Sequence, residues 1–133
     1  MILIGDIGNT DTKICLVSSN YKILKKIILP TKKINNSSLS KKLNFLHKKN
    51  FDIKKSLFSS VVPKKFLLVK SIIKKKFLIK CIELKSLNLK KIMKIKVNRR
   101  QIGSDRLANS IAVTSKNNNY IILDFGTATT FDV

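Results

Sequence analysis

Residues 2–13 are Ile2-Leu3-Ile4-Gly5-Asp6-Ile7-Gly8-Asn9-Thr10-Asp11-Thr12-Lys13, an apolar segment that runs into a turn of small polar residues. The short apolar run Ile2 to Ile4, with turn formers directly after it, is typical of a buried strand. We expect Asp6 at the end of this strand, facing the mouth of a site. Gly8 lets the backbone approach a ligand closely, and the amides of such a turn can form an anion-binding concavity. Neutral donors and one positive charge complete the stretch: Asn9, Thr10, Thr12 and Lys13.

These residues fit two interpretations, a phosphate-binding hairpin and an ordinary hairpin whose Asp and Gly serve only the turn. A second copy favours the first. Asp124-Phe125-Gly126-Thr127-Ala128-Thr129-Thr130 also follows an apolar strand, Tyr120 to Leu123, and its Asp, Gly and Thr recur at the same offsets. The two copies are too far apart for a solenoid or propeller repeat. They are spaced for two lobes that face a shared cleft, where they would hold a polyphosphate and a metal from both sides.

A third motif, Gly103-Ser104-Asp105-Arg106, opens a predicted helix whose buried face would be formed by Leu107, Ala108, Ile111 and Ala112. Ser104 is the predicted N-cap, and Asp105 in the first turn suits the positive end of the helix dipole. Taken alone, the motif is also explained as a capped helix start.

The order of elements predicts an α/β fold. The first three strands, within residues 2–29, form an antiparallel meander. A helix to about Asn50, a strand at 57–62, a helix at 64–77, a strand at 78–84 and the helix after Gly103 follow. This βββαβαβα order suggests a mixed sheet flanked by helices. We expect residues 1–117 to form one lobe and residues 118–133 to be the start of a second, truncated lobe.

The composition is strongly basic, with 28 Lys plus Arg against 7 Asp plus Glu and a net charge of +21. Such a charge indicates either nucleic-acid binding or a compositional bias toward lysine. The lysines are scattered as pairs, and no basic block is interleaved with aromatic residues, so nucleic-acid binding is not expected. Five of the seven acids lie in or beside the three motifs: Asp6, Asp11, Asp105, Asp124 and Asp132.

The remaining signals are negative ones. Cys15 and Cys81 are flanked by aliphatic residues, which predicts buried free thiols in a reducing compartment. His47, the single histidine, stands among lysines and is predicted to be solvated. Neither a secretory leader nor a bilayer-spanning apolar segment is recognisable. The expected location is the cytoplasm, without membrane attachment.

Four motifs, in this order and at these distances, closely resemble the type III pantothenate kinase family, also known as Bvg accessory factor-like. They are Asp6-Ile7-Gly8-Asn9-Thr10, Ser59-Ser60-Val61-Val62-Pro63, Gly103-Ser104-Asp105-Arg106 and Asp124-Phe125-Gly126-Thr127-Ala128-Thr129. The resemblance implies the acetate-kinase/actin/hsp70 (ribonuclease H-like) fold. It spans nearly the whole chain but covers only about the first half of a family member, so the lobe that supplies most adenosine contacts in the family is absent from it.

The resemblance implies phosphorylation of pantothenate to 4'-phosphopantothenate by ATP, the first step of coenzyme A biosynthesis, in a homodimer. It assigns the first hairpin to the ATP phosphates and their magnesium, with Asp6 as the magnesium ligand and Thr127 as a further ATP contact. The hairpin residues are Asp6, Ile7, Gly8, Asn9, Thr10, Asp11, Thr12 and Lys13. Gly103, Ser104, Asp105 and Arg106 would contact pantothenate, with Asp105 as general base. Asp124 would hold a monovalent cation, potassium or ammonium.

The chemistry agrees with these residue types. Transfer of a γ-phosphoryl group depends mostly on positioning and charge neutralisation, and a carboxylate such as Asp105 can accept the hydroxyl proton. Arg106 is available for a bidentate contact to substrate or phosphoryl group. One departure concerns the segment before the third motif, where family members often have a tyrosine and a proline and this chain has Lys96-Val97-Asn98-Arg99. The alternative function is a non-catalytic remnant or accessory protein that binds a partner or nucleic acid through its charge. We expect that the 133 residues are not active alone.

Overall fold

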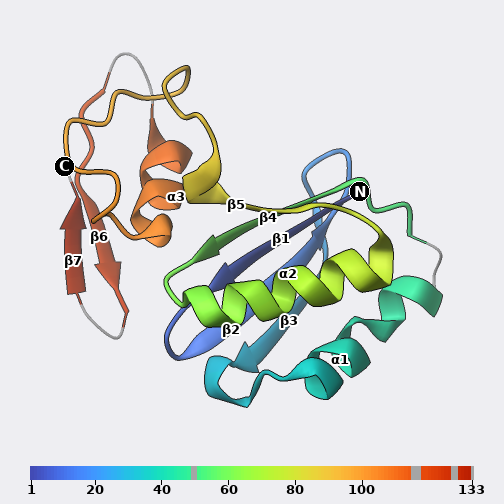
Figure 1. Cartoon of the computed structure of the whole chain (residues 1–133). Coiled ribbons are helices and arrows are strands. Elements are labelled where there is room, and N and C mark those ends of the chain that lie inside the picture. The colour runs from blue at the N-terminus through green and yellow to red at the C-terminus, as the bar shows by residue number, and fades with distance from the viewer. Residues whose placement is uncertain (49–50, 115–117, 127–128, 133) are drawn as a thin grey trace.

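The computed structural model describes residues 1–48, 51–114, 118–126 and 129–132. This part of the chain forms seven strands, three α-helices and two short 3-10 helices (Figure 1). In chain order they are β1 (Ile2–Ile7), β2 (Asp11–Val17), β3 (Ile23–Pro30), η1 (Thr31–Lys33), α1 (Asn36–Lys48), β4 (Lys55–Ser60), α2 (Pro63–Phe77), β5 (Cys81–Glu83), η2 (Leu84–Ser86), α3 (Ser104–Val113), β6 (Ile122–Phe125) and β7 (Thr129–Asp132).

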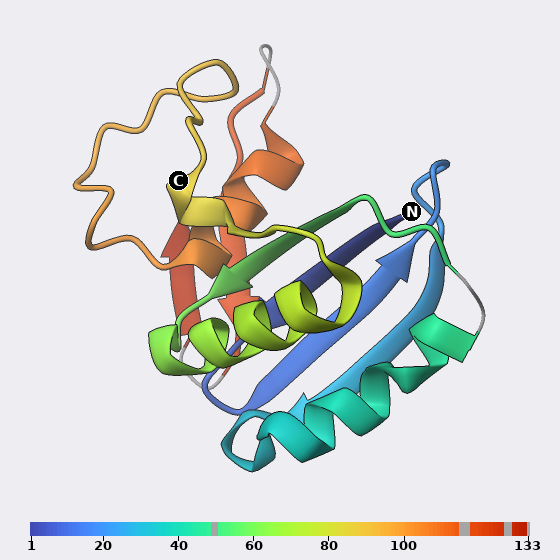
Figure 2. The same cartoon turned by 45° about the vertical axis from the view of Figure 1, so that its right-hand side comes forward.

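Five strands form one mixed sheet in the order β3-β2-β1-β4-β5, and β6 and β7 form a separate hairpin. β1, β2 and β3 are antiparallel neighbours, whereas β4 runs parallel to both β1 and β5. The helices α1 and α2 lie together on one face of the sheet, and α3 lies with β6 and β7 beyond the other side (Figures 1 and 2). The predicted α/β class and mixed sheet are therefore confirmed.

Strand β1 shows how the sequence divides the two faces. Side chains alternate along a strand, so Leu3 and Ile7 point toward α1 and α2 and are 1% and 0% exposed. Ile4 and Asp6 point to the opposite face, where both line a pocket. Gly5 lies beside the buried ring of Phe58 on β4, its partner in the parallel register. The main core is completed by apolar side chains of the helices: Leu39, Leu43, Leu46, Phe66, Val69, Ile72 and Ile73.

A second, smaller core holds α3 in place. Leu84 of η2, Leu89 and Leu107 of α3 are buried together, and α3 contacts both β4 and η2. Ser104, the first residue of α3, donates a hydrogen bond from its hydroxyl to the Glu83 carboxylate, 2.5 Å away. Packing and this hydrogen bond fix the start of α3, and therefore Asp105, over the pocket face of the sheet.

Several predicted boundaries differ from the observed ones. Ser104 is not the N-cap, because Gly103 occupies that position and Ser104 bonds Glu83 instead. The strand predicted at 78–84 is reduced to β5, since Leu78 ends α2 in a left-handed conformation with φ 57° and its amide donates to the Lys74 carbonyl. Ala112, predicted as buried, is exposed.

The other predictions on single elements are confirmed only in part. β4 begins earlier than the predicted 57–62, and Val61 and Val62 lead into α2 after it. Cys81 is buried as predicted, Cys15 is only half-buried, and both thiols are free. The His47 side chain lies outside what the structure describes. Within the described residues, none of the helices is long and apolar enough to cross a bilayer.

Candidate active site

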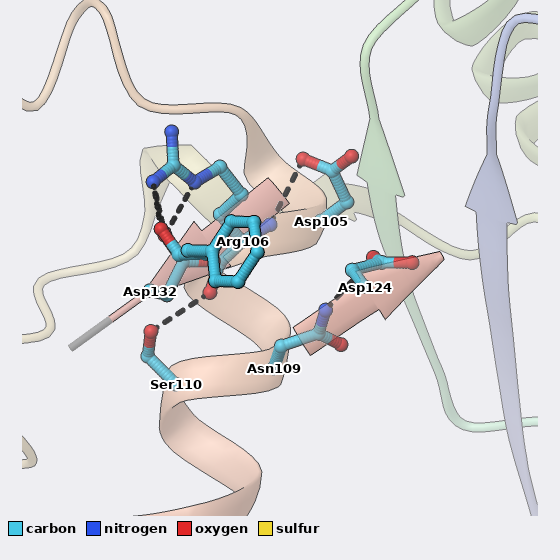
Figure 3. Close-up of polar contacts among 7 residues, drawn as sticks. Asp105, Arg106, Asn109, Ser110, Asp124 and Asp132 are labelled. Atoms are coloured by element: carbon cyan, nitrogen blue, oxygen red, sulfur yellow. Dashed lines mark hydrogen bonds and ion pairs between the residues drawn. The ribbon is translucent and has the colours of Figure 1, made fainter. Parts of the chain in front are cut away.

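Three of the carboxylates singled out in the sequence line one pocket of about 540 Å³. Asp6 comes from β1, Asp105 from the first turn of α3 and Asp124 from β6. Figure 3 shows Asp105 and Asp124 on the side of α3 and β6 that faces β1 and β4. Lys13 of β2 lines the same pocket and is the cross-strand partner of Asp6. The two hairpins and the third motif, distant in sequence, therefore meet at one place.

The surroundings of Asp6 disfavour the ionised form of its carboxyl group. Burial raises the pKa of its carboxyl above the ordinary value, and the nearby carboxylates of Asp105 and Asp124 raise it further. The Ser59 hydroxyl and the Lys13 ammonium act in the opposite direction and are outweighed. A positive ion in the pocket would relieve the repulsion between these carboxylates. Such an arrangement is expected of a carboxylate that binds a cation or takes part in catalysis.

We expect Asp6→Asn to raise Tm at pH 7. Because the folded state raises the pKa of Asp6, Asp6 contributes most to stability below the ordinary aspartate pKa of about 3.9. That contribution is lost as pH rises through the raised folded-state pKa. The advantage of asparagine should therefore be present at neutral pH and should vanish at about pH 3.5. Calorimetry at both pH values measures it.

Asp52→Asn is the matched control for this prediction, because the Asp52 side chain is 78% exposed and lies outside the pocket. It should show neither the gain at neutral pH nor its loss in acid. A Tm of Asp6→Asn equal to or below that of the wild type at pH 7 would contradict the account of Asp6.

The Asp105 carboxylate depends on the glycine two positions before it. A Cβ on Gly103 would lie 2.2 Å from Asp105 Oδ1, closer than any real contact allows. The same oxygen accepts a hydrogen bond from the Arg106 amide at 2.8 Å, in the first turn of α3. A side chain at position 103 would therefore turn the Asp105 carboxylate out of its present orientation, in which it folds back over the helix start and is half-buried at the pocket wall.

Asp124 is tied to α3 by a residue that the sequence did not single out. Asn109 Nδ2 donates a hydrogen bond to Asp124 Oδ2 at 3.2 Å, and the pair is visible in Figure 3. Asn109 follows Asp105 by four residues, so both lie on one face of the helix. This four-residue spacing is the sequence signal that could have identified Asn109. The contact holds the second hairpin against the helix that carries Asp105.

Arg106 and Asp105 are neighbours in sequence but line different pockets. The Arg106 guanidinium pairs with the Asp132 carboxylate and donates a hydrogen bond to the Phe131 carbonyl at 3.2 Å, pointing away from Asp105 (Figure 3). It lines a second pocket of about 670 Å³ that also includes Lys96, Val97 and Asn98. The segment that departs from the family pattern is thus part of the wall near Arg106. Arg99 instead donates to the carbonyls of Lys85 and Leu87.

The tip of the first hairpin is stabilised internally. The Gly8 amide donates to the Asp11 carbonyl at 3.0 Å, so this amide is engaged in the turn. Thr31 Oγ1 donates to the Gly8 carbonyl at 2.7 Å and lies 2.9 Å from Thr12 Oγ1. Because the Thr31 hydroxyl has one proton, Thr12 is the donor in that pair. Thr12 is 0% exposed, and Thr31 was not foreseen from the sequence.

The other residues of the hairpin differ in exposure. Ile7 is 0% exposed, so its side chain is not available to a ligand, while Asn9 and Thr10 are exposed at the tip. Gly103 and Ser104 lie at the start of α3, where the Ser104 side chain is buried against Glu83. Thr127, expected to contact ATP, lies outside the described residues.

The pocket offers oxygen ligands for a hard cation. No group of three His, Cys, Asp or Glu side chains close enough to hold a metal occurs in the described part of the chain. Magnesium in phosphoryl-transfer sites usually needs only one or two carboxylates, because waters and substrate phosphates complete its shell. Asp6 and Asp124 line the same pocket, and two carboxylates of this kind fit such a cation.

Comparisons with known proteins identify the family of this chain. The family model described as "Type III pantothenate kinase" matches residues 2–133. A type III pantothenate kinase of Pelagibacter ubique is 65% identical over 133 residues, covering 100% of this chain and 54% of the relative. Those of Desulforapulum autotrophicum and Listeria monocytogenes are 31% and 34% identical over 138 residues, covering 53% and 52% of the relatives. The chain thus spans about half the length of the curated relatives it matches. The resemblance drawn from the four motifs is confirmed, and the chain belongs to the type III pantothenate kinase family.

Proposed function

We propose that this chain forms the N-terminal half of a type III pantothenate kinase, which transfers the γ-phosphoryl group of ATP to pantothenate at the first step of coenzyme A biosynthesis. The observation that carries the proposal is the convergence of Asp6, Asp105 and Asp124 on one pocket. Family membership supplies the reaction, and the pocket supplies a place where its parts meet. Residues 1–117 would be the actin-like lobe, and residues 118–133 would begin the second lobe.

Asp105 is the general base in this proposal. Its carboxylate accepts the proton of the primary hydroxyl of pantothenate as that oxygen attacks the γ-phosphorus, and ADP leaves with the electrons of the broken bond. The position of Asp105 at the pocket wall, fixed by α3 and by the absence of a side chain on Gly103, provides the orientation. Arg106, Gly103 and Ser104 would line the pantothenate side, where the Arg106 side chain is 41% exposed despite its pairing with Asp132.

The nucleotide side would be formed by the first hairpin, residues 6–13, with Lys13 neutralising phosphate charge and Thr127 as a further contact. Asp6 would hold Mg²⁺ and Asp124 a potassium or ammonium ion. When bound, these ions neutralise charge on the phosphates. The elevated pKa of Asp6 supports its part, because a nearby cation stabilises the ionised carboxylate. We further propose a homodimer located in the cytoplasm.

A chimera tests the proposed function. Residues 1–133 of this chain, joined to the remaining half of the Pelagibacter ubique relative, should phosphorylate pantothenate in an ATP- and magnesium-dependent reaction, because the 65% identity extends over the entire chain. The isolated 133-residue chain should be inactive, since the nucleotide cleft needs both halves. Release of ADP coupled to formation of phosphopantothenate measures both.

The full-length Pelagibacter relative is the positive control, and the chimera carrying Asp105→Asn is the negative one. Activity of the isolated chain would refute the need for a second half. A folded but inactive chimera that binds arbitrary DNA in a salt-sensitive manner would favour the accessory-protein alternative instead.

A further inference from the structure

One buried hydroxyl in the pocket is not explained by the fold. Ser59 of β4 is 8% exposed, and its Oγ forms no hydrogen bond of normal geometry with any described residue. The hydroxyl is close enough to the Asp6 carboxylate to lower its pKa. Asp6 is therefore a polar neighbour of the Ser59 hydroxyl, which is left without a hydrogen-bond partner among the described residues.

The other serines of β4 show what a structural hydroxyl does here. Ser56 Oγ donates to the Lys80 carbonyl at 3.2 Å, which joins β4 to the chain before β5. Ser60 Oγ accepts a hydrogen bond from the Val62 amide at 3.1 Å at the entrance to α2. Ser59 has neither function. Burying a hydroxyl without a partner costs free energy, so a position that keeps one is a candidate for a contact made only when a ligand is present.

The surroundings of Ser59 indicate the chemistry of that ligand. Ser59 is the register partner of Asp6, and the pocket it lines holds the carboxylates of Asp105 and Asp124. Among the uncharged polar side chains lining this pocket, the Asn109 amide already donates to Asp124. The Ser59 hydroxyl therefore remains as a neutral donor beside the cationic Lys13. A ligand that carries oxyanions needs such donors wherever it approaches carboxylates.

We propose that Ser59 is a ligand-binding residue whose hydroxyl donates a hydrogen bond to a phosphoryl oxygen of the nucleotide. This inference rests on the proposed kinase function and adds a residue of the Ser59-Ser60-Val61-Val62-Pro63 motif to the site. It also separates the two adjacent serines of that motif. Ser60 stabilises the turn into α2, and Ser59 contacts the ligand.

The test compares Ser59→Ala with Ser60→Ala in the chimera. Ser59→Ala should weaken binding of a non-hydrolysable ATP analogue with magnesium by about 2- to 10-fold, the loss of one neutral hydrogen bond. Its Tm without ligand should fall less than that of Ser60→Ala, because Ser59 Oγ has no hydrogen-bond partner and gives up only its favourable effect on the Asp6 carboxylate. Ser60→Ala should do the reverse, with a lower Tm and nearly unchanged affinity. Isothermal titration calorimetry and thermal unfolding measure the two effects.

A conservative variant guards against loss of fold. Ser59→Thr keeps a hydroxyl on a β-branched side chain that strands accommodate, and it should retain more affinity than Ser59→Ala. The inference is overturned if Ser59→Ala lowers Tm while affinity is unchanged, or if alanine and threonine weaken binding equally. The two proposals fail separately. A chimera that phosphorylates pantothenate with Ser59→Ala at full nucleotide affinity removes only the inference, whereas Ser59-dependent nucleotide binding without phosphorylation removes only the kinase function.

Discussion

Asp105→Asn is expected to lower the kcat of the chimera by about 100- to 10,000-fold, the range for loss of a general acid–base group. Asparagine keeps the size of the side chain and can still accept the hydrogen bond from the Arg106 amide, which Asp105 Oδ1 accepts at 2.8 Å. It cannot take up the hydroxyl proton of the substrate. Steady-state assays with both substrates should therefore show a large loss in kcat with small changes in KM.

The control for this prediction is again Asp52→Asn, an exposed aspartate outside the pocket, which should leave kcat unchanged. Thermal unfolding should show that Asp105→Asn preserves the fold, because the start of α3 is held by Ser104 and by the smaller core around Leu107. A kcat within about tenfold of the wild type would exclude Asp105 as the general base.

The second large effect is on stability. Gly5→Ala is expected to destabilise the chain by at least about 1–3 kcal/mol, the usual cost of overpacking a dense core. A Cβ at Gly5 would lie 2.1, 2.5 and 2.8 Å from three atoms of the Phe58 ring. Phe58 is 0% exposed, so the ring can move only by displacing its neighbours in the core. Chemical denaturation of the 133-residue chain measures the loss.

A compensating variant makes this prediction specific. Phe58→Leu alone should destabilise by leaving a cavity, but in the double variant the smaller side chain makes room for the new methyl group. The destabilisation of Gly5→Ala/Phe58→Leu should therefore be smaller than the sum of the two single effects, as expected for residues in contact. Additive effects would show that the steric conflict lies elsewhere.

Much of the fold was predictable because its signals are local. The short apolar runs of the strands, the apolar spacing in α1 and α2 and the order of these elements predicted a mixed sheet with helices, and the structure contains one. Boundaries were less predictable where a distant residue decides them. Gly103 is the N-cap of α3, and the Ser104 hydroxyl donates a hydrogen bond to Glu83, 21 residues earlier, instead of capping the helix.

The candidate site likewise contains residues that the sequence identified and contacts that only the structure shows. The motifs identified Asp6, Asp105 and Asp124 as the carboxylates of interest, and the four-residue spacing of Asp105 and Asn109 is visible in the sequence. Arg106 could not be separated from Asp105 by any sequence pattern. Its direction depends on Asp132, 26 residues later.

By itself, the sequence determined the order of motifs, the family they resemble and the order of strands and helices, because these depend on residue type and short-range periodicity. Only the tertiary structure decided that the first hairpin, residues 6–13, is held by Thr31, that Gly5 makes room for Phe58, and that Asp6 meets Asp105 and Asp124 in one pocket. It also distinguished Ser59 from its two neighbouring serines on β4. These are contacts between segments far apart in the chain, and packing of the whole core, rather than any local preference, fixes which side chains meet.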